Sequence, residues 1–195
     1  ILEFKTNSIF GICRVLQSQG ALAEVVSGFE YDLAERLGYK GSDIVFNGPH
    51  KTRENLEHAF RSRSLVNIDN YEELARADAA AVIIGEIMPI GIRINSDFGL
   101  IGDTLWNRSR LSRDRFGFNL ESGEALSAVK SIKSTFRNLT LVGLSMHIGT
   151  NIEVPSMYQS ALDLMLSFGR TLIKEFGVNL RYLDLGGGLA IPDDR

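Results

Sequence analysis

Short apolar, β-branched segments recur along the chain at nearly constant spacing, and this spacing is the strongest constraint on its fold. The first four segments end at Lys5, Ser27, Asn47 and Asp69, which are 22, 20 and 22 residues apart. That length fits one β-strand, one helix and their loops. The complete set of predicted strands is Ile1–Lys5, Ala23–Ser27, Ile44–Asn47, Leu65–Asp69, Pro89–Asn95, Leu141–His147 and Arg181–Leu185.

Amphipathic patterns and capping signals predict a helix after most of these strands. Ser27 and Glu30 have the spacing of a capping box, and Thr52 and Asp69 are suitable N-caps for the next two helices. Gly20, Gly38 and Gly177 stand where helices commonly end. The other predicted helices are Ser8–Gln19, Ser122–Phe136 and Ser156–Phe176.

Strands that alternate with helices predict an α/β fold with a parallel sheet. Seven such units with largely apolar strands favour a (β/α)8 TIM-type barrel over an open doubly wound sheet. A leucine-rich repeat has similar spacing, but its repeating leucine pattern is absent. Only seven strands can be counted, so we expect an incomplete barrel and a chain that is a fragment or a processed product.

Composition excludes several classes of protein. The 195 residues are 44% hydrophobic and carry a net charge of −3, which predicts neither a nucleic-acid surface nor a membrane patch. Cys13 is the one cysteine, so a disulfide framework or a multi-cysteine metal site cannot form. No metal site is predicted. No signal peptide or membrane span is visible, and we expect a cytoplasmic protein.

Polar residues gather where the predicted strands end. In a (β/α)8 barrel these ends form one rim, which carries the active site. The rim would hold Lys5, Asn7, Ser27, Glu30, Asn47, Asp69, Arg93, Asn95, His147, Asp184 and the glycines 186–188. So many polar residues after apolar strands predict a functional site.

Three features of this rim suggest chemistry. Gly186, Gly187 and Gly188 follow the seventh strand, where backbone N–H groups can bind a phosphate, although a tight turn explains them equally well. His147 is a candidate catalyst or an ordinary rim residue. Lys5 must be desolvated or paired, and a desolvated lysine is a nucleophile that forms Schiff bases. A lysine and a phosphate loop on one rim suggest a phosphorylated aldehyde, namely pyridoxal 5′-phosphate.

The whole chain then resembles a known family, the fold-type III pyridoxal-phosphate decarboxylases, which act on diaminopimelate, ornithine and arginine. Seven segments match that family's motifs in order, and the match is closest to the diaminopimelate branch. They are LEFKTN, EVVSGFE, IVFNGPHKT, IRINSD, DRFGF, SMHIGT and LDLGGGLAIP. The resemblance implies a barrel of the alanine racemase-like kind, with residues 1–195 as a partial cofactor-binding domain.

The resemblance also implies a role for each matching residue. Lys5 would form the Schiff base with pyridoxal 5′-phosphate, and His147 would stack on the pyridine ring. Thr150 and the backbone of Gly186, Gly187 and Gly188 would bind the phosphate. Glu30 and Arg93 would line the cofactor pocket. The implied reaction is decarboxylation of an amino acid.

Other elements of the family are not found in this sequence. The acidic partner of the pyridine nitrogen, the cysteine motif of a second subunit and the C-terminal β-domain are missing. Glu24 stands for the usual aspartate and Thr6 for the usual alanine. We therefore expect this piece to be inactive alone and the full-length form to be a homodimer with a shared active site.

Three alternative functions remain. An amino-acid racemase of the same fold type would share the barrel and the lysine, but KTNSIFG lacks the tyrosine–glycine–histidine sequence of that group. A catalytically inactive relative could bind and regulate a partner. A phosphosugar aldolase would usually take its lysine from a later strand. Arg108, Arg110, Arg113 and Arg115 crowd the loop 96–115, where they could bind a substrate carboxylate or simply be solvated.

Overall fold

The computed structural model describes residues 1–96 and 116–190, and its sheet is parallel throughout. Seven strands follow one another in the order β1-β2-β3-β4-β5-β7-β8, and the short β6 pairs beside this row with β5. The strands are β1 (Leu2–Glu3), β2 (Ala23–Val25), β3 (Ile44–Phe46), β4 (Leu65–Ile68), β5 (Met88–Asn95), β6 (Phe118–Asn119), β7 (Leu139–Met146) and β8 (Tyr182–Leu185). The predicted incomplete α/β barrel is confirmed.

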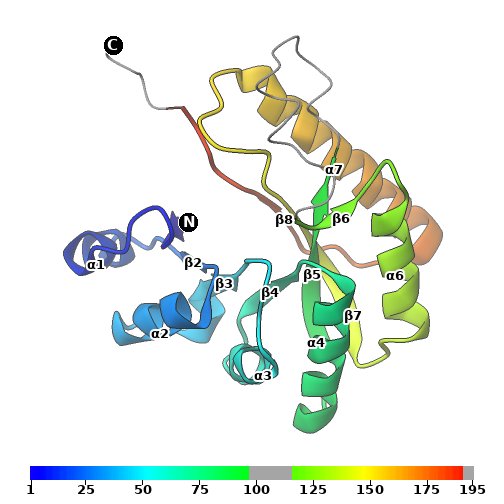
Figure 1. Ribbon diagram of the computed structural model, residues 1–195, viewed down its shortest axis with the longest axis horizontal. Coiled ribbons are helices and arrows are strands. Elements are labelled where there is room, and N and C mark those ends of the chain that lie inside the picture. The colour runs from blue at the N-terminus through cyan, green and yellow to red at the C-terminus, as the bar shows by residue number, and fades with distance from the viewer. Residues whose placement is uncertain (97–115, 191–195) are drawn as a thin grey trace.

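Helices follow most strands and lie around the outer side of the curved row of strands, as Figure 1 shows. They are α1 (Phe10–Ser18), α2 (Gly28–Arg36), α3 (Arg53–Arg61), α4 (Tyr71–Ile84), α6 (Glu124–Ser134) and α7 (Pro155–Phe176), with a short 3₁₀ turn, η1 (Gly41–Asp43), before β3. Among the described residues, no helix is long and apolar enough to cross a membrane.

The helix starts agree in part with the capping signals. The Thr52 side chain accepts a hydrogen bond from the backbone of Asn55 and forms a full capping box with it. The Ser27 side chain accepts one from Glu30 N–H, but the Glu30 carboxylate accepts from Val26 N–H instead of completing the box. The prediction that Asp69 caps α4 was wrong.

Asn70 caps α4, because its side-chain oxygen accepts from Glu73 N–H at 2.9 Å. The carboxylate of Asp69 is thereby left to bind a partner across the sheet. The strand boundaries also differ from the predictions: β1 ends at Glu3, two residues before Lys5, and β6 was not predicted.

The core lies between the strands and the helices. β-Branched and aromatic residues of the strands, among them Ile44, Phe46 and Ile92, are fully buried against helix residues such as Leu56 and Leu74. Burial of apolar surface of this kind supplies most of the favourable free energy of folding. Because the strands are parallel, their carboxyl ends meet at one rim and carry the polar residues predicted there.

Candidate active site

Lys5 lies just after β1 at the rim, and it is paired and not desolvated. Its Nζ is 3.0 Å from Oε1 of Glu3, and the exposed fractions of the two side chains are 40% and 18%. Thr6 donates a hydrogen bond to the other carboxylate oxygen of Glu3 at 2.8 Å. Burial raises the pKa of Glu3, but the hydrogen bonds from Thr6 and Lys5 and the positive charge of Lys5 together outweigh it, so the pKa is lowered. Glu3 thus faces Lys5 as a carboxylate.

His147 follows β7 and lies against the start of the glycine-rich loop. A Cβ atom on Gly186 would approach Nδ1 of His147 to 2.7 Å, so the loop passes close to the imidazole only because residue 186 has no side chain. Burial lowers the pKa of His147, and the positive charges of Lys5 and Arg93 lower it further. The imidazole is therefore neutral near pH 7.

The glycine-rich loop also joins the segment after His147. Ile152 N–H donates to the carbonyl of Gly188 at 2.7 Å, and Ala190 N–H donates to the carbonyl of Ile152 at 3.2 Å. Gly188 has a φ of +111°, and a Cβ on it would meet the carbonyl of Gly149 at 2.0 Å and Cα of Thr150 at 3.3 Å. The structure therefore brings together His147, Thr150 and the three glycines.

Arg93 extends from β5 toward the same rim and is held by a carboxylate. Its Nη1 lies 3.2 Å from Oδ1 of Asp69, and the exposed fractions of the two side chains are 17% and 4%. Glu30 stands at the start of α2, where its carboxylate is bound to Val26 N–H at 2.8 Å. Both residues belong to the rim, as predicted.

A polar network fills the space below the rim. Asn47 donates to Glu24 at 2.8 Å and to Asp184 at 3.1 Å, and Asn67 and Ser145 also donate to Asp184, each at 3.1 Å. Burial raises the pKa of Glu24 to about 7, with a smaller contribution from the negative charge of Asp184. Glu24 thus titrates close to physiological pH.

The raised pKa of Glu24 makes the stability of the protein depend on pH. Below the ordinary glutamate pKa both folded and unfolded states hold the proton, and the stabilising contribution is complete. As the pH rises toward about 7, the unfolded chain has lost the proton while folded Glu24 retains it, so the contribution is lost. We expect wild type to lose about 3 kcal/mol more than Glu24→Gln between about pH 5 and about pH 8.

Urea unfolding at several pH values measures this difference. Glutamine is the matched replacement, because its side-chain oxygen can accept the same hydrogen bond from Asn47 without carrying a titrating proton. If the free energies of unfolding of wild type and variant changed with pH in parallel, the prediction would be contradicted, even if one protein were more stable than the other at every pH.

A buried ion pair supports the rim, and the sequence did not reveal it. Lys51 and Glu73 are both 0% exposed, with Nζ 2.9 Å from Oε2. Lys51 also donates to the carbonyls of Gly48 and Asn67, while the Glu73 carboxylate accepts from the backbone N–H groups of Lys51 and Asp69. The pair therefore joins the loops after β3 and β4. Lys51 lies in one of the family-like segments, but nothing in the sequence indicates its partner.

Some predictions lie outside the described residues, namely those on Arg108, Arg110, Arg113 and Arg115. His58 on α3 has its Nε2 2.9 Å from Oε1 of Glu35 on α2, so its polar contact is with a neighbouring helix. Among the residues the structure describes, no group of three or more histidine, cysteine, aspartate or glutamate side chains could hold a metal ion.

The rim suits a flat aromatic aldehyde that carries a phosphate. The glycine-rich loop presents backbone without side chains, and Gly186 leaves no atom between this backbone and the neutral imidazole of His147. Such a backbone can approach a phosphate closely. Lys5 supplies a primary amine, and Arg93 adds a positive charge. The residues present therefore fit pyridoxal 5′-phosphate.

Comparisons with known proteins agree with this site. Residues 3–195 match the family described as pyridoxal-dependent decarboxylase, pyridoxal binding domain. Diaminopimelate decarboxylases of Pseudomonas fluorescens and Methanocaldococcus jannaschii are 31% and 30% identical, over 96% and 97% of this chain. The chain covers only 44% and 43% of those relatives, so it spans less than half of their length.

A solved structure shows the same fold. The crystal structure of the M. jannaschii diaminopimelate decarboxylase in co-complex with L-lysine superposes with a TM-score of 0.86 at 29% identity. The alignment covers 99% of this chain and 44% of that one. With the family match over almost the whole chain, it follows that the chain belongs to the pyridoxal-dependent decarboxylases, as their pyridoxal-binding domain, and that its cofactor is pyridoxal 5′-phosphate.

Proposed function

We propose that this chain is the cofactor-binding part of an enzyme that decarboxylates an amino acid through a Schiff base with Lys5. The observation that carries the proposal is that Lys5, His147, Thr150 and the glycine-rich loop lie on one rim of the barrel. The relatives reported above are named decarboxylases, which favours decarboxylation over racemisation or a purely regulatory role.

Several residues of the rim have a part in this proposal. Bound pyridoxal 5′-phosphate supplies an aldehyde that condenses with an amine and a ring that takes up the electrons left when CO2 departs. Lys5 provides the first amine, and the carboxylate of Glu3 at 3.0 Å orients it. The neutral ring of His147 would pack on the cofactor, and the glycine-rich loop with Thr150 would hold the phosphate.

The proposed substrate is a diaminopimelate-like amino acid. The support is that the M. jannaschii relative is a diaminopimelate decarboxylase and that its structure holds L-lysine. A homodimer with a shared active site and a cytoplasmic location, which the family resemblance implies, belong to the same proposal.

An absorbance spectrum tests the role of Lys5. The longest natural form of the protein is mixed with pyridoxal 5′-phosphate and compared with Lys5→Ala and with Lys40→Ala. The Lys40 side chain is exposed, and the residue lies before the amino end of β3, whereas the rim is formed by the carboxyl ends of the strands. We expect wild type and Lys40→Ala to show an absorbance band near the visible edge that borohydride bleaches. We expect Lys5→Ala to show no such band. Release of CO2 from diaminopimelate then tests the substrate.

The result that overturns the proposal is equally clear. A band that persists in Lys5→Ala would assign the Schiff base to another amine. A folded wild-type protein without any band would make Lys5 a structural residue and leave the regulatory alternative.

A further inference from the structure

The guanidinium group of Arg93 is fixed from two sides. Oδ1 of Asp69 lies 3.2 Å from Nη1, and the ring centre of Phe116 lies 5.1 Å from Cζ. Asn95 holds the Phe116 segment in place, because its side-chain amide donates to the carbonyls of Phe116 and Gly117. A carboxylate and an aromatic face thus leave this guanidinium little freedom to rotate.

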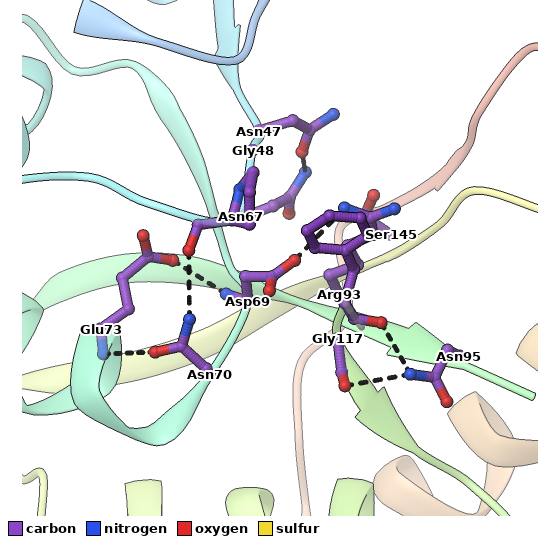
Figure 2. A network of polar contacts seen from close by, with 12 residues as sticks. Asn47, Gly48, Asn67, Asp69, Asn70, Glu73, Arg93, Asn95, Gly117 and Ser145 are labelled. Carbon is purple, nitrogen blue, oxygen red and sulfur yellow. Dashed lines mark hydrogen bonds and ion pairs between the residues drawn. The ribbon is translucent and has the colours of Figure 1, made fainter. Parts of the chain in front are cut away.

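Asp69 is itself held by the buried pair beneath it. Its backbone N–H donates to Oε2 of Glu73 at 2.8 Å, and the same oxygen is 2.9 Å from Nζ of Lys51. Figure 2 shows Asp69 between Glu73 and Arg93, with its carboxylate turned toward the arginine. The contacts therefore run without a gap from the pair to Asp69 and from Asp69 to Arg93.

This chain of contacts ends at the candidate site. The positive charge of Arg93 is close enough to His147 to lower the pKa of that imidazole. A displaced guanidinium would therefore change the surroundings of the cofactor as well as the local packing.

We propose that Asp69 is a positioning residue that orients Arg93 toward the cofactor and that the Lys51–Glu73 pair holds Asp69 in place. The inference rests on the proposed function, since it takes Arg93 to line the pyridoxal 5′-phosphate pocket. Asp69 does not touch the cofactor in this arrangement, and its effect passes entirely through Arg93.

A double-mutant cycle tests this dependence. The dissociation constant of pyridoxal 5′-phosphate is measured by absorbance titration for wild type, Asp69→Asn, Arg93→Gln and the double variant, all in the longest natural form. Asp69→Asn is expected to weaken binding about tenfold, because a charge-assisted hydrogen bond to the guanidinium is lost. The double variant is expected to bind no more weakly than Arg93→Gln alone, since residues that act in series are not additive.

The chain offers a matched control on its surface. Glu86 pairs with Arg63 at 2.8 Å, but the exposed fractions of these side chains are 51% and 63%. Glu86→Gln should leave cofactor affinity unchanged. Thermal melting of every variant shows whether it is folded, and Asp69→Ser replaces Asp69→Asn if the asparagine variant does not fold.

The outcomes separate the two proposals. If wild type shows no Lys5-dependent absorbance band, the proposed function fails, and this inference fails with it. If wild type binds the cofactor but Asp69→Asn binds it equally well, only the inference is wrong. The inference is also wrong if the fold-changes in the dissociation constant caused by Asp69→Asn and by Arg93→Gln multiply in the double variant.

Discussion

Replacing Lys51 by methionine is expected to lower the free energy of unfolding by about 3 to 5 kcal/mol. Methionine fills a similar volume, but it leaves the carboxylate of Glu73 buried at 0% exposure without its counter-charge. It also removes the hydrogen bonds to the carbonyls of Gly48 and Asn67, which are then buried without a partner from Nζ. Urea unfolding monitored by circular dichroism measures the loss.

The matched control is Arg63→Met, which also breaks an ion pair. Arg63 and Glu86 are mostly exposed, so water replaces the lost contacts, and the expected loss is much smaller than that of Lys51→Met. If Lys51→Met were as mild as Arg63→Met, the buried pair would not join the two loops as described.

Replacing Gly143 by alanine is expected to lower the free energy of unfolding by roughly 3 kcal/mol or more. A Cβ at this position on β7 would lie 2.1 Å from Cζ of Tyr182 and 2.3 Å from Cε1, far closer than van der Waals contact. The Tyr182 hydroxyl already lies against Gly91 on β5, where an added Cβ would come within 2.3 Å of it. That hydroxyl donates to Asn67 at 2.8 Å, so moving the ring also breaks a hydrogen bond.

Two further variants identify the cause. Gly11→Ala lies on α1, where a Cβ meets no atom within 4 Å, and it should be neutral or slightly stabilising. Gly143→Ala combined with Tyr182→Leu should be less unstable than the sum of the two single variants, because the smaller side chain relieves the clash. Strict additivity would mean that the ring is not the obstacle.

The fold could be predicted largely from local pattern. The regular spacing of the strand ends predicted a parallel sheet, because consecutive strands that are linked by helices pair in parallel. The structure confirms seven such strands side by side. Boundaries were less accurate, since hydrogen bonding to a neighbour decides where a strand ends. Strand β6 has only two residues, which is too short for an alternation of apolar and polar residues to be recognised in the sequence.

The candidate site was predicted less completely. Motifs identified Lys5, His147 and the glycine-rich loop, because such loops have a distinctive composition. Pairings such as Lys51 with Glu73 depend on which loops become neighbours in space, and a single sequence holds no signal of that. For Asp69 the residue type suited a helix cap, yet the neighbouring Asn70 took that position and left its carboxylate to bind Arg93.

The network around Asp184 has a consequence for the order of folding. Its carboxylate accepts hydrogen bonds from Asn47 and Asn67, which lie 137 and 117 residues earlier in the chain. Contacts so distant in sequence form slowly. At common rates of protein synthesis, Asp184 leaves the ribosome on the order of ten seconds after Asn47. Asn67 also donates to Asn47 at 2.7 Å, so the two amides can bind each other before β8 is synthesised.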